Sequence, residues 1–333
     1  MGAVTRAEGK GRGKLLLFGE HAAVYGHPAV GLSLPESIRA EVALGGGEGW
    51  RFPRALPEER ERLCLLLERF RRIIPGLEQA RGGELVLVSD IPRGQGFGSS
   101  AALCAAVAAA LCSALGRGEP LEGIWAYAHE AERLFHGTPS GIDTGLALLA
   151  GLYLFRPDPP RLPAARRLPG RELPLVVGAL PRRAETGELI RRLRERMEAG
   201  QRRTARLLGE LGDIARRSGE LLEDGPQGPA GERLALLGEL AWQAQERLAA
   251  LKLSTPELDA LLEQGRRAGA LGGKLSGAGG GGAFYLIFAE PQAALAAAGL
   301  LRAAAGSRMP AAAETIRALL WPWPTVRSRC LPG

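Results

Sequence analysis

Three glycine-rich segments hold most of the residues in this sequence that could do chemistry. The middle segment, residues 91–102, reads IPRGQGFGSSAA, follows a predicted strand and opens a predicted helix. Glycines let backbone N–H groups come close to an anion, and the first turn of a helix adds unpaired N–H groups and partial positive charge. The segment therefore predicts a phosphate site; the alternative is a tight strand-to-helix turn without a ligand. The residues expected to bind the phosphate are Gly94, Gly96, Gly98, Ser99, Ser100 and Ala101.

Two carboxylates further along the chain could act together with this segment. Glu132 falls on a predicted helix, and Asp143 follows a turn at residues 137–141. Carboxylates on different elements can converge, so that one holds a metal ion while the other faces a hydroxyl group. An ordinary surface carboxylate after a loop is the alternative for Asp143. Zinc is a further alternative, because His129, Glu132 and His136 share one helical face, but no other ligand clusters with them and structural histidines are favoured.

Short apolar runs between glycine and proline signals predict the strands, and a helical periodicity predicts the helices that must position these side chains. The expected strands are residues 14–18, 29–34, 38–44, 84–89, 151–155, 173–179 and 283–289. The expected helices are residues 57–74, 99–115, 121–135, 185–217, 232–251, 256–269 and 291–305, with a break in the fourth at Gly200. Strand, helix and strand recur in both halves, which indicates two α/β or α+β domains.

The length of 333 residues suits about two domains of roughly 150 residues each. Residues 156–170 contain five prolines and are expected to cross from one domain to the other. The predicted domains are therefore residues 1–168 and 169–333.

The chain carries 43 Lys+Arg against 36 Asp+Glu, a net charge of +7, yet only four of the basic residues are lysine. A basic chain could bind nucleic acid, a membrane surface or a small anion. The arginines in residues 188–206 alternate with glutamates, as on a solvated helix face, and aromatic residues, at 5%, are too few to favour base stacking. We therefore expect no nucleic-acid partner. Two of the scarce lysines, Lys14 and Lys274, lie beside glycine-rich segments.

The four cysteines form no CxxC pair, which indicates free thiols in a reducing compartment. The longest apolar run, residues 101–115, is shorter than the roughly 20 residues that cross a bilayer. The polar residues up to Lys14 show no signal-peptide pattern. These features predict a cytoplasmic protein without membrane contact.

The glycine-rich segments resemble, in the same order, the motifs of the GHMP kinases. Residues 91–102 resemble the phosphate loop of that family and lack the patterns of a Rossmann fingerprint and of a Walker A loop. Residues 13–26, GKLLLFGEHAAVYG, and residues 274–282, KLSGAGGGG, resemble the first and third family motifs. Residues 129–143, HEAERLFHGTPSGID, are similar to a stretch typical of the mevalonate kinases within the family. The resemblance covers nearly the whole chain.

This resemblance implies an ATP- and Mg²⁺-dependent phosphorylation of the primary hydroxyl of mevalonate, in isoprenoid biosynthesis, with mevalonate and ATP as small-molecule partners. It implies that Ser100 and Glu132 hold Mg²⁺ and that the phosphate loop holds ATP. It further implies that Asp143 accepts the hydroxyl proton while Lys14 offsets charge on the transferring group. Contacts to the acceptor substrate are expected from Glu20, His21, Thr186, Gly277 and Ala278.

The implied fold is α+β, with an N-terminal domain like domain 2 of ribosomal protein S5, a C-terminal ferredoxin-like domain and the active site between them. Dimers are common among such kinases, so a homodimer is one expectation. Two alternatives stay open: another GHMP kinase that acts on phosphomevalonate, a sugar or homoserine, and a catalytically silent, ligand-binding member of the fold. The intact set of Lys14, Ser100, Glu132 and Asp143 argues against the silent member.

Overall fold

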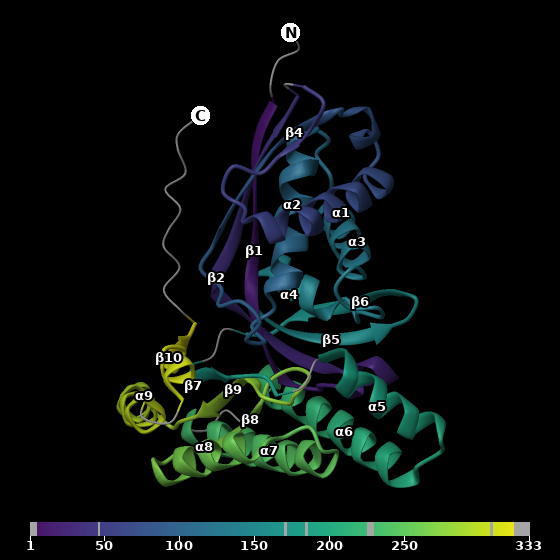
Figure 1. The fold of residues 1–333 in the computed structure, drawn as a ribbon. Helices are drawn as coiled ribbons and strands as arrows, with labels where there is room; N and C mark the ends of the chain where they lie inside the picture. The colour runs from purple at the N-terminus through teal and green to yellow at the C-terminus, as the bar shows by residue number, and fades with distance from the viewer. Residues whose placement is uncertain are drawn as a thin grey trace.

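The computed structural model describes residues 5–45, 47–169, 172–183, 186–224, 230–306 and 309–322, which form two β-sheets with helices packed on them (Figure 1). The first sheet contains β1 (Thr5–Phe18), β2 (Ala29–Leu44), β3 (Gly49–Arg51), β4 (Gly82–Ser89), β5 (Leu152–Asp158) and β6 (Arg161–Arg167). Its order is β3-β4-β2-β5-β6, with β1 paired to β2. The long β2 replaces two expected strands, because residues 29–32 pair with β5 and residues 38–44 pair with β4.

Four helices cover this sheet: α1 (Pro57–Ile73), α2 (Ser99–Ala114), α3 (Leu121–Glu132) and α4 (Ile142–Leu149). The alanine-rich α2 packs very closely on β1. A side-chain carbon added at Gly9 or Gly11 would lie 2.1 or 2.0 Å from carbonyl oxygens of α2, so only glycine fits at these two positions. This close packing brings the start of α2, where the phosphate loop ends, next to the strand that carries Lys14.

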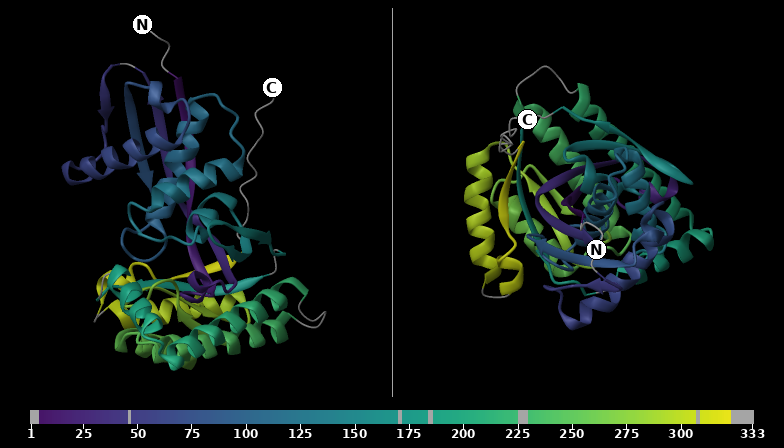
Figure 2. Two further views of the ribbon diagram at one scale, coloured as in Figure 1. Left: turned by 90° about the vertical axis from the view of Figure 1, so that its right-hand side faces the viewer. Right: turned by 90° about the horizontal axis from the view of Figure 1, so that it is seen from above.

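The second sheet contains β7 (Leu173–Leu180), β8 (Gly272–Leu275), β9 (Gly282–Ile287) and β10 (Arg317–Trp321), all antiparallel, in the order β10-β7-β9-β8. The helices that follow β7 in the chain are α5 (Thr186–Glu198), α6 (Arg202–Asp224), α7 (Ala230–Ala250), α8 (Pro256–Arg267), α9 (Pro291–Gly306) and α10 (Pro310–Ala313), and α6 packs on β2 of the first sheet as well as on α7. Two further short turns of 3-10 helix are Ala22–Tyr25 and Leu77–Gln79. The last strand of this unit lies beside the first, which is the topology expected of a ferredoxin-like domain. Helices α7 and α8 lie at the opposite end of the molecule from α1 and α2 (Figure 1, Figure 2).

Several elements confirm or correct the sequence-based expectations. The predicted break at Gly200 is confirmed, since it separates α5 from α6 with a φ of +67°. Residues 161–167, within the expected interdomain crossing, instead form β6 at the edge of the first sheet. Helix α3 ends at Glu132, short of the expected end, and the unexpected α4 follows it. The chain passes to the second sheet only between β6 and β7.

Among the described residues, Cys64, Cys104 and Cys112 are free thiols, and Cys330 lies outside them. None of the described helices is long and apolar enough to cross a membrane. One set of packed, buried side chains runs through both sheets, from Leu15 on β1 to Tyr285 on β9. The two sheets therefore share a continuous core beside the site.

Candidate active site

A cavity of about 400 Å³ lies where the end of β1, the phosphate loop and α4 meet a glycine loop of the second sheet. The predicted residues that line it are Lys14, Glu20, His21, Gly94, Gly96, Gly98, Ser99, Ser100, Glu132, Asp143, Gly277 and Ala278. Ala101 is fully buried in the first turn of α2 and does not line the cavity. Thr186 is the first residue of α5, and its side chain lies outside the described part of the chain. The fold thus joins residues that are far apart in the sequence, from Lys14 to Ala278, in one site.

The phosphate loop presents backbone donors to this cavity. Its three glycines have φ angles from +71° to +90°, a conformation that other residues adopt only with strain. Helix α2 begins at Ser99, and the N–H of Ala102 donates to the carbonyl oxygen of Gly98 at 2.9 Å. The N–H groups before Ala102, including that of Ala101, lie ahead of the first intrahelical acceptor. Such groups are suited to bind phosphate oxygens, so Ala101 can contribute through its backbone alone.

Lys14 and Asp143 form a salt bridge in the cavity. The Lys14 Nζ and Asp143 Oδ2 atoms are 3.1 Å apart, with the side chains 5% and 30% exposed. The N–H of Lys14 donates to the carbonyl oxygen of Phe97 at 2.9 Å, which fixes the lysine against the phosphate loop. Asp143 stands in the first turn of α4, where the helix N-terminus favours a carboxylate. A cation that can offset negative charge and a carboxylate that can accept a proton are therefore fixed beside the loop.

Glu132 is the last residue of α3 and is only 1% exposed. Within the described part of the chain, its Oε2 has no hydrogen-bond partner. Burial, followed by the negative charge of Asp143, raises the pKa of Glu132 well above its usual value, while Lys14 lowers it. A bound cation would stabilise the ionised form of such a carboxylate. Because Ser100 lines the same cavity, a hydroxyl and a carboxylate are both available to a hard metal ion.

Comparisons with known proteins agree with this geometry. Residues 62–151 match the family model of the GHMP kinases N terminal domain, and residues 220–305 match the model of the GHMP kinases C terminal region. The mevalonate kinase of Pyrococcus furiosus is 30% identical in an alignment of 319 positions, gaps included, that covers 89% of this chain and 92% of that protein. The chain belongs to the GHMP kinase family.

A second curated relative and a solved structure are also similar to this GHMP kinase. The mevalonate kinase of Thermococcus gammatolerans is 32% identical in an alignment of 308 positions, gaps included, that covers 86% of this chain and 90% of that protein. The crystal structure of L. major mevalonate kinase in complex with R-mevalonate has the same fold, with a TM-score of 0.75 and 23% identity over 96% of each chain. The expected two-domain α+β fold of a GHMP kinase is thus confirmed.

The first motif of this GHMP kinase places Glu20 and His21 just after β1, where Glu20 contacts the second sheet and His21 contacts its glycine loop. The carboxylate of Glu20 forms a buried ion pair with Lys274 of β8, a partner that the glycine motifs did not indicate. His21 Nε2 lies 3.0 Å from the carbonyl oxygen of Ala278. A carbonyl can only accept, so this contact assigns the proton to Nε2 and leaves Nδ1 as an acceptor. Burial lowers the pKa of His21 to about 4, and the ring is neutral at pH 7.

The histidines near Glu132 make separate contacts. Because α3 ends at Glu132, His136 lies in the following turn and does not share a helical face with His129. His136 Nε2 lies 3.2 Å from Ser100 Oγ, and burial lowers the pKa of His136. No group of three or more His, Cys, Asp or Glu side chains in the described ranges could hold a metal ion. The zinc alternative therefore has no ligand set among these residues.

Four residues that line the cavity lie outside the motifs found in the sequence: Arg182, Ile190, Leu193 and Arg194. A side-chain carbon added at Gly96 would lie 3.1 Å from a guanidinium nitrogen of Arg182, so this arginine lies against the phosphate loop. Arg194 reaches from α5 to donate to Thr138 Oγ1 at 2.8 Å. The available signals were a Pro-Arg-Arg run after β7 and two apolar residues at helical spacing on α5. In a chain with so many arginines, these signals do not stand out.

Proposed function

We propose that this GHMP kinase transfers the γ-phosphoryl group of ATP to the primary hydroxyl of mevalonate and thereby makes 5-phosphomevalonate. The observation that carries the proposal is the Lys14–Asp143 pair, fixed beside the phosphate loop in a cavity that Glu20 and His21 also line. The names of the curated relatives support mevalonate as the acceptor. The sequences GEHAAVYG and HGTPSGID favour it over a sugar or homoserine.

Phosphoryl transfer requires the protein mainly to align the nucleophile with the phosphate and to neutralise charge. In the proposed complex, the N–H groups of the phosphate loop hold the ATP phosphates. The carboxylate of Asp143 accepts the proton of the primary hydroxyl as its oxygen attacks the γ-phosphorus, and Lys14 Nζ offsets negative charge on the transferring group. Because the Lys14 side chain is only 5% exposed, little water screens this interaction.

Magnesium fits the donor atoms of the cavity. The buried Glu132 Oε2, which has no partner in the described ranges, and the hydroxyl of Ser100 are the hard oxygen donors that Mg²⁺ prefers. Few protein ligands suffice for this ion when phosphates and water complete its shell. Bound there, Mg²⁺ supplies neutralisation of the phosphate charge. We propose Ser100 and Glu132 as its protein ligands.

Replacement of Glu132 with glutamine tests this assignment. The Mg²⁺ concentration that gives half-maximal activity should rise at least about tenfold, because Mg²⁺ binding depends on ligand charge. Since the pKa of Glu132 is raised, protons compete with the ion, and the apparent Mg²⁺ affinity of the wild type should increase with pH. Titrations of activity with Mg²⁺ at several pH values measure both effects.

Glu130→Gln, two positions earlier on α3, is the matched control, because the half-buried Glu130 instead pairs with Arg69 and Arg133 and does not line the cavity. This variant should keep the wild-type Mg²⁺ requirement. An unchanged requirement in Glu132→Gln would assign the metal to other residues.

An assay of ADP release with four acceptors offered separately tests the proposed reaction. Of mevalonate, phosphomevalonate, galactose and homoserine, mevalonate should give the highest kcat/KM. A higher value with another acceptor would assign the chain to a different GHMP kinase activity. Absence of turnover with all four would favour the ligand-binding alternative.

We also propose that the protein works in the cytoplasm, because Cys104 and Cys112 are buried as free thiols, as is typical of a reducing compartment. The domain boundary after residue 168 and the homodimer stay predictions. Limited proteolysis tests the boundary, and light scattering of the purified protein tests the dimer.

A further inference from the structure

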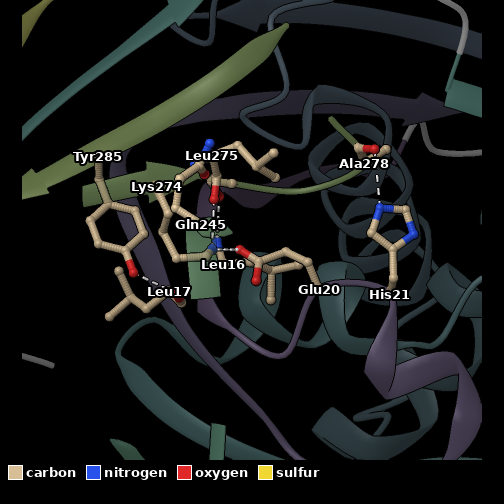
Figure 3. Close-up of polar contacts among 10 residues, drawn as sticks. Leu16, Leu17, Glu20, His21, Gln245, Lys274, Leu275, Ala278 and Tyr285 are labelled. Carbon is tan, nitrogen blue, oxygen red and sulfur yellow. Dashed lines mark hydrogen bonds and ion pairs between the residues drawn. The ribbon is translucent and has the colours of Figure 1, made fainter. Parts of the chain in front are cut away.

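Four contacts join the end of β1 to the second sheet and its glycine loop, and we refer to them as the β1 seam (Figure 3). The backbone N–H of Leu16 donates to Ser276 Oγ at 2.9 Å, and the hydroxyl of Tyr285 donates to the carbonyl oxygen of Leu17 at 2.6 Å. Lys274 donates to the carboxylate of Glu20, and His21 contacts the carbonyl of Ala278. The seam therefore ends at two residues that line the cavity, Glu20 and His21.

Lys274 provides the only ammonium group of the four contacts. Its side chain is 0% exposed and that of Glu20 is 1% exposed. Its Nζ donates to one Glu20 oxygen and, at 2.6 Å, to the carbonyl oxygen of Leu275, and it lies 5.4 Å from the centre of the Tyr285 ring. Gln245 fixes β8, the strand that carries Lys274, because its Oε1 accepts a hydrogen bond from the N–H of Leu275 at 3.0 Å. One oxygen of Glu20 is thereby held in a fixed place.

The second oxygen of Glu20, Oε2, is buried and has no hydrogen-bond partner among the residues that the structure describes. The adjacent His21 presents Nδ1, which is also an acceptor because Nε2 faces a carbonyl. Glu20 and His21 both line the cavity, so a hydrogen bond from a ligand to either acceptor requires a donor on the ligand. An ionised carboxylate or phosphate has no such donor, whereas an alcohol does.

We infer that Lys274 is a positioning residue for the acceptor substrate: by fixing Glu20, it directs Oε2 toward a substrate hydroxyl other than the one that is phosphorylated. This inference rests on the proposed function, and it defines the substrate class as an alcohol with a second hydroxyl group. For mevalonate, that group is the tertiary hydroxyl. The primary hydroxyl lies at Asp143, so two hydroxyls at two fixed carboxylates orient the substrate for attack.

The test compares mevalonate with 5-hydroxy-3-methylpentanoate, which is the same acid without the tertiary hydroxyl. The wild type should favour mevalonate by roughly 10- to 100-fold in kcat/KM, as expected for one hydrogen bond to a charged group. Lys274→Met should reduce this preference to less than about threefold, mainly through a lower kcat/KM for mevalonate.

Tyr285→Phe is the matched control, because it removes a different hydrogen bond of the β1 seam and keeps the ring beneath Lys274. It should retain the full preference for mevalonate. Two results would overturn the inference, because either would mean that Lys274 only joins the sheets. One is an equal loss of kcat/KM on both substrates in Lys274→Met, and the other is the same loss of preference in Tyr285→Phe.

The double variant Glu20→Gln/Lys274→Met decides the matter if Lys274→Met does not fold, because it leaves no unpaired charge of this pair buried. Its preference for mevalonate should fall below about threefold, since neither the Glu20 carboxylate nor the ammonium group that fixes it remains. Retention of the wild-type preference in the double variant would overturn the inference. Absence of mevalonate turnover by the wild type would overturn the proposed function as well, whereas turnover without a preference would overturn the inference alone.

Discussion

Replacement of Asp143 with asparagine is expected to lower kcat by about 10²- to 10⁴-fold, the usual contribution of a general base. Asparagine has nearly the same shape as aspartate but cannot accept the proton of the substrate hydroxyl. Affinity for ATP should change little, because the phosphates are proposed to contact the N–H groups of the phosphate loop. Steady-state ADP release measures kcat, and titration with nucleotide measures ATP binding.

The loss of charge at Asp143 also leaves the buried Lys14 without its ion-pair partner, so the folding of the variant needs its own measurement. Thermal unfolding in the presence and absence of ATP provides it. A folded Asp143→Asn variant that binds ATP and keeps near-wild-type kcat would show that the general-base assignment is wrong.

Replacement of Lys14 with methionine is expected to lower kcat by roughly 100-fold or more, because it removes a preorganised positive charge from the transferring phosphoryl group. Methionine retains most of the aliphatic volume that packs near Gly98, where an added side-chain carbon would lie 2.6 Å from Lys14 Cγ. The variant should therefore fold, and single-turnover rates of ADP formation should show the loss directly.

Lys10→Met is the matched control for this variant, because Lys10 lies on the same strand and is exposed away from the cavity. It should leave kcat within about twofold of the wild type, as is usual for a distant surface change. A loss of about tenfold or less in Lys14→Met would indicate a structural lysine, since stabilisation of developing charge contributes more than that.

The glycine motifs indicated the site residues more clearly than sequence patterns indicated the helices and strands around them. Residues 91–102 meet the physical requirements of an anion site within one short stretch, because glycines that can adopt positive φ angles are followed by the start of a helix. Asp143 was harder to place from pattern alone, because α4 is short and lies between two glycine turns. Its partnership with Lys14 came from the family resemblance, and the geometry of the fold then placed the two side chains 3.1 Å apart.

The partners of Glu20 could not be predicted in the same way. Lys274 stands on a strand of only four residues with two glycines, which carries almost no periodic signal. Its pairing with Glu20 depends on how two sheets meet, which local sequence does not encode. The edge strand β6 was missed for a related reason: its proline and arginines are typical of a loop, yet an edge strand tolerates both.

The β1 seam has a consequence for the biosynthesis of the protein. The donors and acceptors at its two sides are between 254 and 268 positions apart in the chain. The ribosome makes β1 more than 250 residues before β8 and β9, and domains generally fold in order of synthesis. The first sheet can therefore assemble long before Glu20 meets Lys274. A nascent chain that ends before β8 has its phosphate loop but no completed acceptor side, so the catalytic cavity is finished only after β8 and the glycine loop that follows it have been made.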